Sequence, residues 1–227
     1  MTAIKICGIT NCEDASVAAL SGVDAIGFIF HPPSPRYVTP EAARKIIAEL
    51  PLPVITVGVF VNQDAQEVKR IMTLCNLDML QLHGAEPPAY CSQFPKSQVI
   101  KALALRTEDD LAQLSEYPIK AVLVDAFDPL LPGGTGKKAD WSLAARVKKQ
   151  HPLILAGGLT LANIQEAIVS VNPEAVDINT GVESAPRRKD HKKVREIIEL
   201  VHSLRVHRTT IFNRSYTPSP AGGRGRG

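Results

Sequence analysis

Short apolar runs rich in β-branched residues alternate along the chain with longer windows in which apolar residues recur every three or four positions. The short runs predict these strands: Ile4–Cys7, Ala25–Phe30, Val54–Phe60, Met79–Leu82, Val99–Ala102, Ala121–Asp125, Leu153–Ala156 and Ala175–Ile178. Each run is apolar almost throughout, which is typical of a parallel sheet covered by helices.

The windows between the strands carry signals for helix starts and ends. Thr39 before Pro40 predicts the start of one helix, and Pro51 predicts its end. Another helix is predicted from Asp190 to Leu204, where apolar residues line one face. The repeated strand–helix pairs place the chain in the α/β class.

Eight strand–helix pairs within residues 1–204 favour a single domain, a (β/α)8 TIM barrel. An open doubly wound sheet is the alternative, although such sheets usually have fewer strands. Residues 205–227 are rich in Arg, Gly, Pro and Ser, and predict a flexible, disordered C-terminal tail. An arginine–glycine arm for nucleic acid is one interpretation. We favour an extension without that role, because the arginines are few and no aromatic run separates them.

Charge and hydropathy narrow the range of partners. The formal net charge of +3 depends on the end of the chain, since removal of the four arginines after residue 205 (Arg208, Arg214, Arg224 and Arg226) leaves −1. The predicted barrel therefore gives no indication of a nucleic-acid partner. No apolar run approaches the roughly 20 residues of a membrane span, and Met1 leads into a strand rather than a signal peptide. We expect a cytoplasmic protein with no membrane partner.

Cysteine and histidine spacing gives no indication of a metal. The four cysteines form no Cys-x-x-Cys pair and are expected to be free thiols. The histidines are scattered and share no metal-ligand spacing with cysteines or carboxylates, so we expect no metal site.

Cys7 lies where reacting groups collect in such a barrel, at the carboxyl end of the first strand. Lys5, two residues earlier, shares its face of the strand, and a nearby cation favours the thiolate that acts as base or nucleophile. A small buried core residue is the alternative for Cys7. A buried lysine needs a partner, and we predict that Lys5 pairs with Asp177 of the last strand.

Other strand ends also carry polar groups. Asp125 ends an apolar strand and can deliver a proton, whereas a turn cap is its alternative role. Arg36 lies in a loop stiffened by prolines and suits a planar carboxylate, unless it simply faces solvent. His83 follows the fourth strand, as an acid or base or as a hydrogen-bonded wall residue.

Three glycine-rich segments complete the candidate site. The loop containing Gly134, Thr135 and Gly136 can close over a ligand, and it lacks the spacing of a P-loop. Turns at Gly157-Gly158 and Thr180-Gly181 follow strands seven and eight, where these barrels usually bind phosphate through backbone N–H groups.

From Ile4 to Leu204 the chain resembles the phosphoribosylanthranilate isomerase family. The resemblance rests on Lys5-Ile6-Cys7-Gly8, Gly27-Phe28-Ile29-Phe30, Ser34-Pro35-Arg36, Val59-Phe60-Val61-Asn62, Gln81-Leu82-His83-Gly84, Asp125, Gly133-Gly134-Thr135-Gly136, Asp140-Trp141, Ala156-Gly157-Gly158-Leu159 and Gly181-Val182-Glu183-Ser184. One departure is Arg187, where the family usually has glycine, so the turn before the last helix is expected to be altered.

The resemblance implies an Amadori rearrangement of N-(5-phosphoribosyl)anthranilate without a cofactor. It makes Cys7 the general base, Asp125 the general acid and Arg36 the ligand of the anthranilate carboxylate. His83 and the loop of Gly134, Thr135 and Gly136 would also contact this phosphosugar, while the turns after strands seven and eight bind its phosphate. The protein would be a monomer or a homodimer.

Two rival functions differ in the residues they need. An indole-glycerol-phosphate synthase would use a lysine and glutamates at its strand ends, and a pentose-phosphate epimerase would need metal-binding histidines and aspartates. The strand ends here offer a thiol, a carboxylate and a guanidinium instead. A barrel without activity that binds nucleic acid through its tail is the rival from another class.

Overall fold

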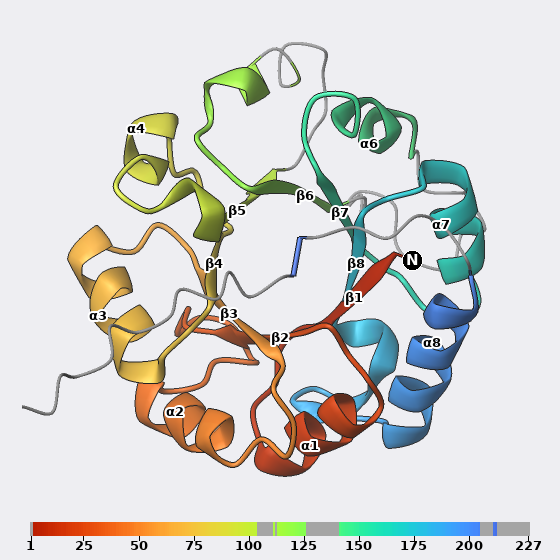
Figure 1. Ribbon diagram of the computed structural model, residues 1–227. Helices are drawn as coiled ribbons and strands as arrows, with labels where there is room; N and C mark the ends of the chain where they lie inside the picture. The colour runs from red at the N-terminus through yellow and green to blue at the C-terminus, as the bar shows by residue number, and fades with distance from the viewer. Residues whose placement is uncertain (1, 104–110, 112, 126–140, 205–210, 213–227) are drawn as a thin grey trace, which may run out of the picture.

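A computed structural model describes residues 2–103, 111, 113–125, 141–204 and 211–212. In it parallel strands β1 to β8 close into a barrel in sequence order (Figure 1). The strands are β1 (Ala3–Ile6), β2 (Ala25–Ile29), β3 (Ile55–Phe60), β4 (Met79–Leu82), β5 (Val99–Leu103), β6 (Ala121–Asp125), β7 (Leu153–Ala156) and β8 (Ala175–Ile178). The predicted TIM barrel is therefore confirmed, and the open-sheet alternative is wrong.

Helices surround the barrel on its outside (Figure 1). Those described are α1 (Cys12–Leu20), α2 (Pro40–Ala48), α3 (Ala65–Cys75), α4 (Pro88–Cys91), α6 (Ser142–Val147), α7 (Ile164–Val171) and α8 (His191–Ser203). The predicted starts of α2 and α8 are confirmed, because the side chains of Thr39 and Asp190 accept hydrogen bonds from N–H groups of the first turns.

Alternation along the strands divides the core into two parts. Val122 and Val124 of β6 pack outward against helices, whereas Leu123 between them packs inside the barrel. Ile4 and Ile6 of β1 also face outward, so Lys5 faces the interior. The register of β1 on β8 places Lys5 opposite Asp177, as required for the predicted pair.

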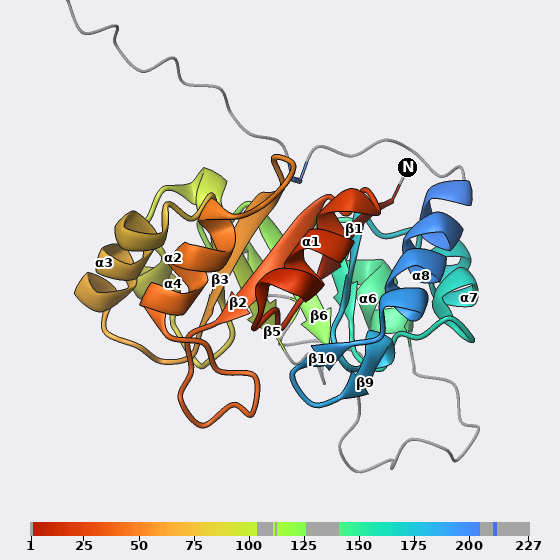
Figure 2. The ribbon, with the colours of Figure 1, turned by 90° about the horizontal axis from the view of Figure 1, so that it is seen from below.

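A two-stranded hairpin, which the sequence patterns did not predict, follows β8. Its strands are β9 (Glu183–Ala185) and β10 (Arg188–Lys189). Figure 2 shows the hairpin beside the carboxyl ends of the barrel strands, next to the loop that follows β2. This end of the barrel, which we call the mouth, contains the candidate site.

The segment expected to be a disordered tail begins at residue 205, and most of it lies outside the described residues. Ile211 departs from that expectation: it is 3% exposed and packs with side chains of the barrel interior, and Phe212 packs against the same cluster. Figure 2 shows residues 211–212 at the end of the barrel opposite the hairpin, on the side of the amino terminus. Among the described helices, none has both the length and the apolar character that a membrane crossing requires.

Candidate active site

Cys7 lies directly after β1 at the mouth and is 4% exposed. Gly27 of β2 leaves room for it, because a Cβ atom there would lie 2.8 Å from Cys7 Sγ. Burial raises the pKa of the Cys7 thiol above its ordinary value, while the nearby Lys5 ammonium opposes this rise. The cation acts in the predicted direction, but desolvation has the larger effect, so the thiol is the resting form near neutral pH.

The predicted Lys5–Asp177 ion pair is confirmed, with 2.9 Å between Lys5 Nζ and Asp177 Oδ2. Lys5 is fully buried and also donates to Gln81 Oε1 of β4 at 3.0 Å, so its ammonium joins three strands inside the barrel. Burial alone would lower the pKa of Lys5, but the Asp177 carboxylate outweighs that effect and raises it. Lys5 is therefore a fixed cation beneath Cys7.

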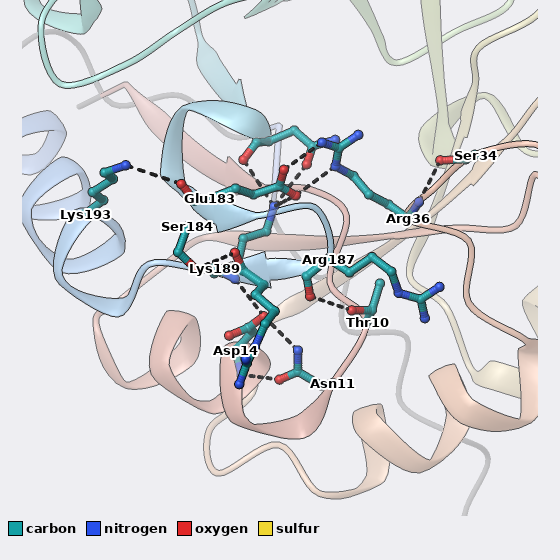
Figure 3. Close-up of polar contacts among 12 residues, drawn as sticks. Thr10, Asn11, Asp14, Ser34, Arg36, Glu183, Ser184, Arg187, Lys189 and Lys193 are labelled. Carbon is teal, nitrogen blue, oxygen red and sulfur yellow. Dashed lines mark hydrogen bonds and ion pairs between the residues drawn. The ribbon is translucent and has the colours of Figure 1, made fainter.

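Arg36 does not simply face solvent, because its guanidinium is held by Glu183 of β9. Arg36 Nε and Nη2 donate to the two carboxylate oxygens at 2.7 and 2.6 Å, and Figure 3 shows the two side chains pointing toward each other. An arginine has five N–H groups, so three remain for a ligand. Glu183 thus fixes the plane in which Arg36 can meet a second carboxylate.

Lys189 of β10 completes this cluster, and sequence reasoning missed it. Its side chain is fully buried and donates to Glu183 Oε1 at 3.2 Å and to Asn179 Oδ1 at 3.0 Å. Burial lowers the pKa of Lys189, with Glu183 opposing. Burial would raise the pKa of Glu183, but the hydrogen bonds from Arg36 and Lys189 hold it below its ordinary value. In the sequence, the signal for this contact was that an acidic residue, Glu183, and a basic residue, Lys189, flank a turn that contains Pro186.

Gly8 allows the first and eighth strand ends to meet at the mouth. Its φ of 73° is left-handed, and a Cβ atom there would lie 2.7 Å from Asn179 Oδ1 and 3.0 Å from Arg36 Cδ. Any larger residue would therefore clash with these two side chains.

The two glycine turns predicted to hold phosphate lie side by side. Gly157 and Gly158 have φ values of 90° and 59°, and a Cβ atom on Gly181 would lie 1.9 Å from the carbonyl oxygen of Leu159. Within the described part of the chain, no protein acceptor is found for the N–H groups of Gly157, Gly158, Thr180 and Gly181. Such N–H groups are suited to an anion.

His83 and Asp125 lie at the ends of β4 and β6, and both are partly open to solvent. Desolvation at the mouth lowers the pKa of the His83 imidazole. The Asp125 carboxylate opposes that shift. Cys7, Arg36 and the glycine turns lie at the same end of the barrel as this pair.

Some predicted features cannot be placed. Gly134, Thr135 and Gly136 lie outside the described residues. No group of three or more potential metal ligands is found among the residues that the structure describes.

Arg187 has a left-handed backbone, which favours glycine. Its φ is 71°, and its carbonyl oxygen accepts a hydrogen bond from Thr10 Oγ1 at 2.9 Å. A left-handed φ is one that glycine adopts freely and arginine adopts only at a cost, and the expectation of an altered turn stays a prediction.

Known proteins resemble this chain closely. The family model for N-(5'phosphoribosyl)anthranilate (PRA) isomerase matches residues 4–200. An N-(5'-phosphoribosyl)anthranilate isomerase of Syntrophus aciditrophicus (strain SB) is 50% identical over 210 residues, covering 92% of this chain and 91% of that protein.

Solved structures give the same result. A phosphoribosyl anthranilate isomerase in complex with reduced 1-(o-carboxyphenylamino)-1-deoxyribulose 5-phosphate is 39% identical with a TM-score of 0.79. Mutually generated monomers of the dimeric enzyme from Thermotoga maritima are 38% identical, also with a TM-score of 0.79. Each match covers 90% of this chain and 100% of the other.

Proposed function

The chain belongs to the phosphoribosylanthranilate isomerase family, and we propose that it converts N-(5-phosphoribosyl)anthranilate into 1-(2-carboxyphenylamino)-1-deoxyribulose 5-phosphate in tryptophan biosynthesis. The observation that carries the assignment of roles is the convergence of a buried thiol, a carboxylic acid and a clamped arginine at one barrel mouth, beside two glycine turns. The reaction needs one proton donor and one proton acceptor, and general acid–base catalysis supplies both.

Asp125 is the general acid in this proposal. It protonates the ring oxygen of the ribose, the bond from that oxygen to C1 breaks, and the nitrogen lone pair forms an iminium ion at C1. The position of Asp125 supports this role, because it is the last residue of β6, at the mouth, and is half-buried.

Cys7 is the general base. The iminium makes the C2 hydrogen acidic, the Cys7 thiolate removes it, and the enolamine that results tautomerises to the C2 ketone. Lys5 supports the step because its cation stabilises the thiolate. No net proton is gained or lost, as an isomerisation requires.

Arg36 binds the anthranilate carboxylate through the N–H groups that Glu183 leaves free. The phosphate binds to the N–H groups of Gly157-Gly158 and Thr180-Gly181. His83, Gly134, Thr135 and Gly136 are proposed as further contacts. Two anion sites at a fixed separation would orient the sugar between acid and base.

The assay follows the loss of anthranilate fluorescence with freshly made phosphoribosylanthranilate. Cys7→Ala and Asp125→Asn should each lower kcat about a hundredfold or more, because each removes a proton-transfer group. Arg36→Ala should act mainly on KM, because it removes a binding contact. Near-normal kcat in Cys7→Ala would exclude that residue as the base.

Matched controls separate chemistry from folding. Cys75→Ala removes a buried thiol on α3, and Asp64→Asn changes a carboxylate that caps the same helix while keeping a good cap. Arg70→Ala removes an exposed arginine that pairs with its neighbour Glu67. All three should turn over substrate at the wild-type rate.

A monomer and a homodimer both stay predictions for this chain, as does the cytoplasm as its location. The dimeric enzyme of Thermotoga maritima supports the homodimer. Light scattering after size exclusion distinguishes the two states by mass. Deletion of residues 206–227 should leave turnover intact, whereas the nucleic-acid rival requires that binding of single-stranded RNA disappear with the deletion.

A further inference from the structure

Gln81 of β4 has no role in the chemistry above, yet its side chain connects two polar groups of the mouth. It is 1% exposed. Its Oε1 accepts from Lys5 Nζ at 3.0 Å, and its Nε2 lies 2.8 Å from His83 Nδ1. The series Asp177, Lys5, Gln81, His83 thus crosses the barrel interior from β8 to the end of β4.

The chemistry of these groups fixes the direction of each hydrogen bond. An ammonium can only donate, so the amide oxygen of Gln81 must face Lys5. The amide NH2 must then face His83, and Nδ1 of that ring must accept. A neutral imidazole that accepts at Nδ1 carries its proton on Nε2.

The charges around His83 agree with a neutral ring. Desolvation lowers its pKa, the carboxylates of Asp125 and Asp177 act against this, and the cations of Lys5 and Lys101 act with it. The imidazole is therefore neutral near neutral pH, with Nδ1 unprotonated. It adds no positive charge at the mouth.

We propose that Gln81 is a positioning residue that fixes His83 as the Nε2–H tautomer, so that His83 presents a neutral N–H donor at the mouth, where Asp125 also lies. This donor stabilises the negative charge that develops on Asp125 as its proton passes to the substrate. The catalytic part of the proposal rests on the role given to Asp125 above, whereas the tautomer itself does not.

The tautomer is measured first, on the wild-type protein without substrate. Histidine ring correlations between nitrogen-15 and carbon-bound protons distinguish the two neutral forms, and a His83→Asn variant assigns the signal. We expect the Nε2–H pattern near neutral pH. An Nδ1–H or an imidazolium pattern overturns the proposal, even if the enzyme is fully active.

Gln81→Glu provides the second test. A carboxylate at this position can only accept, so His83 must place a proton on Nδ1, as the other tautomer or as imidazolium. Gln66→Glu adds the same charge on the exposed face of α3 and should leave the ring unchanged. A wild-type ring pattern in folded Gln81→Glu contradicts the proposal. If that variant does not fold, Gln81→Met is used, and its ring should lose the single fixed tautomer.

Kinetics tests whether Gln81 acts through His83. Gln81→Met should lower kcat about tenfold, the effect of one lost hydrogen bond to a charged group. In a His83→Ala background the same change should cost less than twofold, because its partner is gone. If the two changes lower kcat by independent factors that multiply, Gln81 does not act through His83, and the catalytic part of the proposal is overturned. The ring spectra still decide the tautomer. Loss of activity in Asp125→Asn is the separate test of the proposed function.

Discussion

Single side chains at the mouth are set by competition between burial and charge. Cys7 shows the balance most directly, because desolvation raises its pKa while Lys5 and Lys189 lower it, and burial prevails. Arg36 shows the opposite case, because the Glu183 carboxylate outweighs desolvation and raises its pKa. The base is therefore held as a thiol at rest, and the arginine is held permanently charged.

The state of Cys7 predicts the pH dependence of turnover. A base works only when deprotonated, so a raised pKa moves the limb of the kcat/KM profile that Cys7 sets to higher pH. Replacing Lys5→Met and Asp177→Asn together removes a larger lowering and a smaller raising effect on the pKa of Cys7. In this double variant the limb of the kcat/KM profile should therefore lie at still higher pH.

The measurement is kcat/KM against pH for both proteins with one substrate stock. Titration of the substrate phosphate is common to both profiles and cancels in the comparison. A limb that moves to lower pH would mean that Lys5 does not act on the base.

Arg187 predicts a gain in stability from a single substitution. Its φ of 71° costs an ordinary residue about 1 kcal/mol that glycine avoids. Arg187→Gly should therefore raise the free energy of unfolding by up to about 1 kcal/mol, as followed by urea denaturation. Arg188→Gly, in β10, should lower it instead. Equal effects from both variants would argue against strain at residue 187.

Elements at the mouth are joined by buried polar contacts between loops. Lys101 of β5 is 1% exposed and pairs with Glu86 at 3.0 Å, and it also donates to the carbonyl oxygens of Leu82 and Gly84. Glu86 accepts in turn from the backbone N–H of Asn62 after β3. This cluster connects three consecutive strand ends, and a periodic apolar pattern contains no sign of it.

The cluster predicts a large cost for removing one partner. Lys101→Met should destabilise the protein by about 3 kcal/mol, because the Glu86 carboxylate then stays buried without its cation. Lys101→Met combined with Glu86→Gln should cost less than the single change. Chemical denaturation of wild type, both single variants and the double variant gives the coupling, and additive costs would mean that the two groups act independently.

The whole barrel is closed at the end opposite the site by a residue from beyond the last helix. The interior there is lined by small side chains at strand starts, among them Ala3, Ala25, Ala121 and Ala175. Ile211 packs into this cluster and is 3% exposed. Burial of an isoleucine among such residues contributes on the order of 2 kcal/mol.

Burial of Ile211 therefore predicts that residues 205–212 stabilise the barrel, whereas residues 213–227 do not. Ile211→Asp should lower the free energy of unfolding by about 2 kcal/mol or more, and truncation after Leu204 should do the same. Truncation after Phe212 should have little effect, since residues 213–227 are mostly polar or glycine. Thermal melts of the three variants decide the matter, and kcat should be unaffected in all of them.

The sequence by itself determined the barrel. Strand and helix periods depend on each residue and its near neighbours, and eight apolar strands with capped helices between them fit few other folds. It also determined the order of polar strand ends, which allowed Cys7, Arg36 and the Lys5–Asp177 pair to be predicted at one end of the barrel. These features depend only on the parity and direction of parallel strands.

Only the tertiary structure decided which groups meet across the chain. Glu183 lies 147 residues after the Arg36 that it holds. Lys101 of β5 contacts Glu86 of the loop after β4, and Gln81 contacts Lys5 across the barrel interior. Burial acts in the same way: desolvation of Cys7 and packing of Ile211 depend on the atoms that surround them in space. Distances and dielectric surroundings are properties of the folded barrel, so no local pattern contains them.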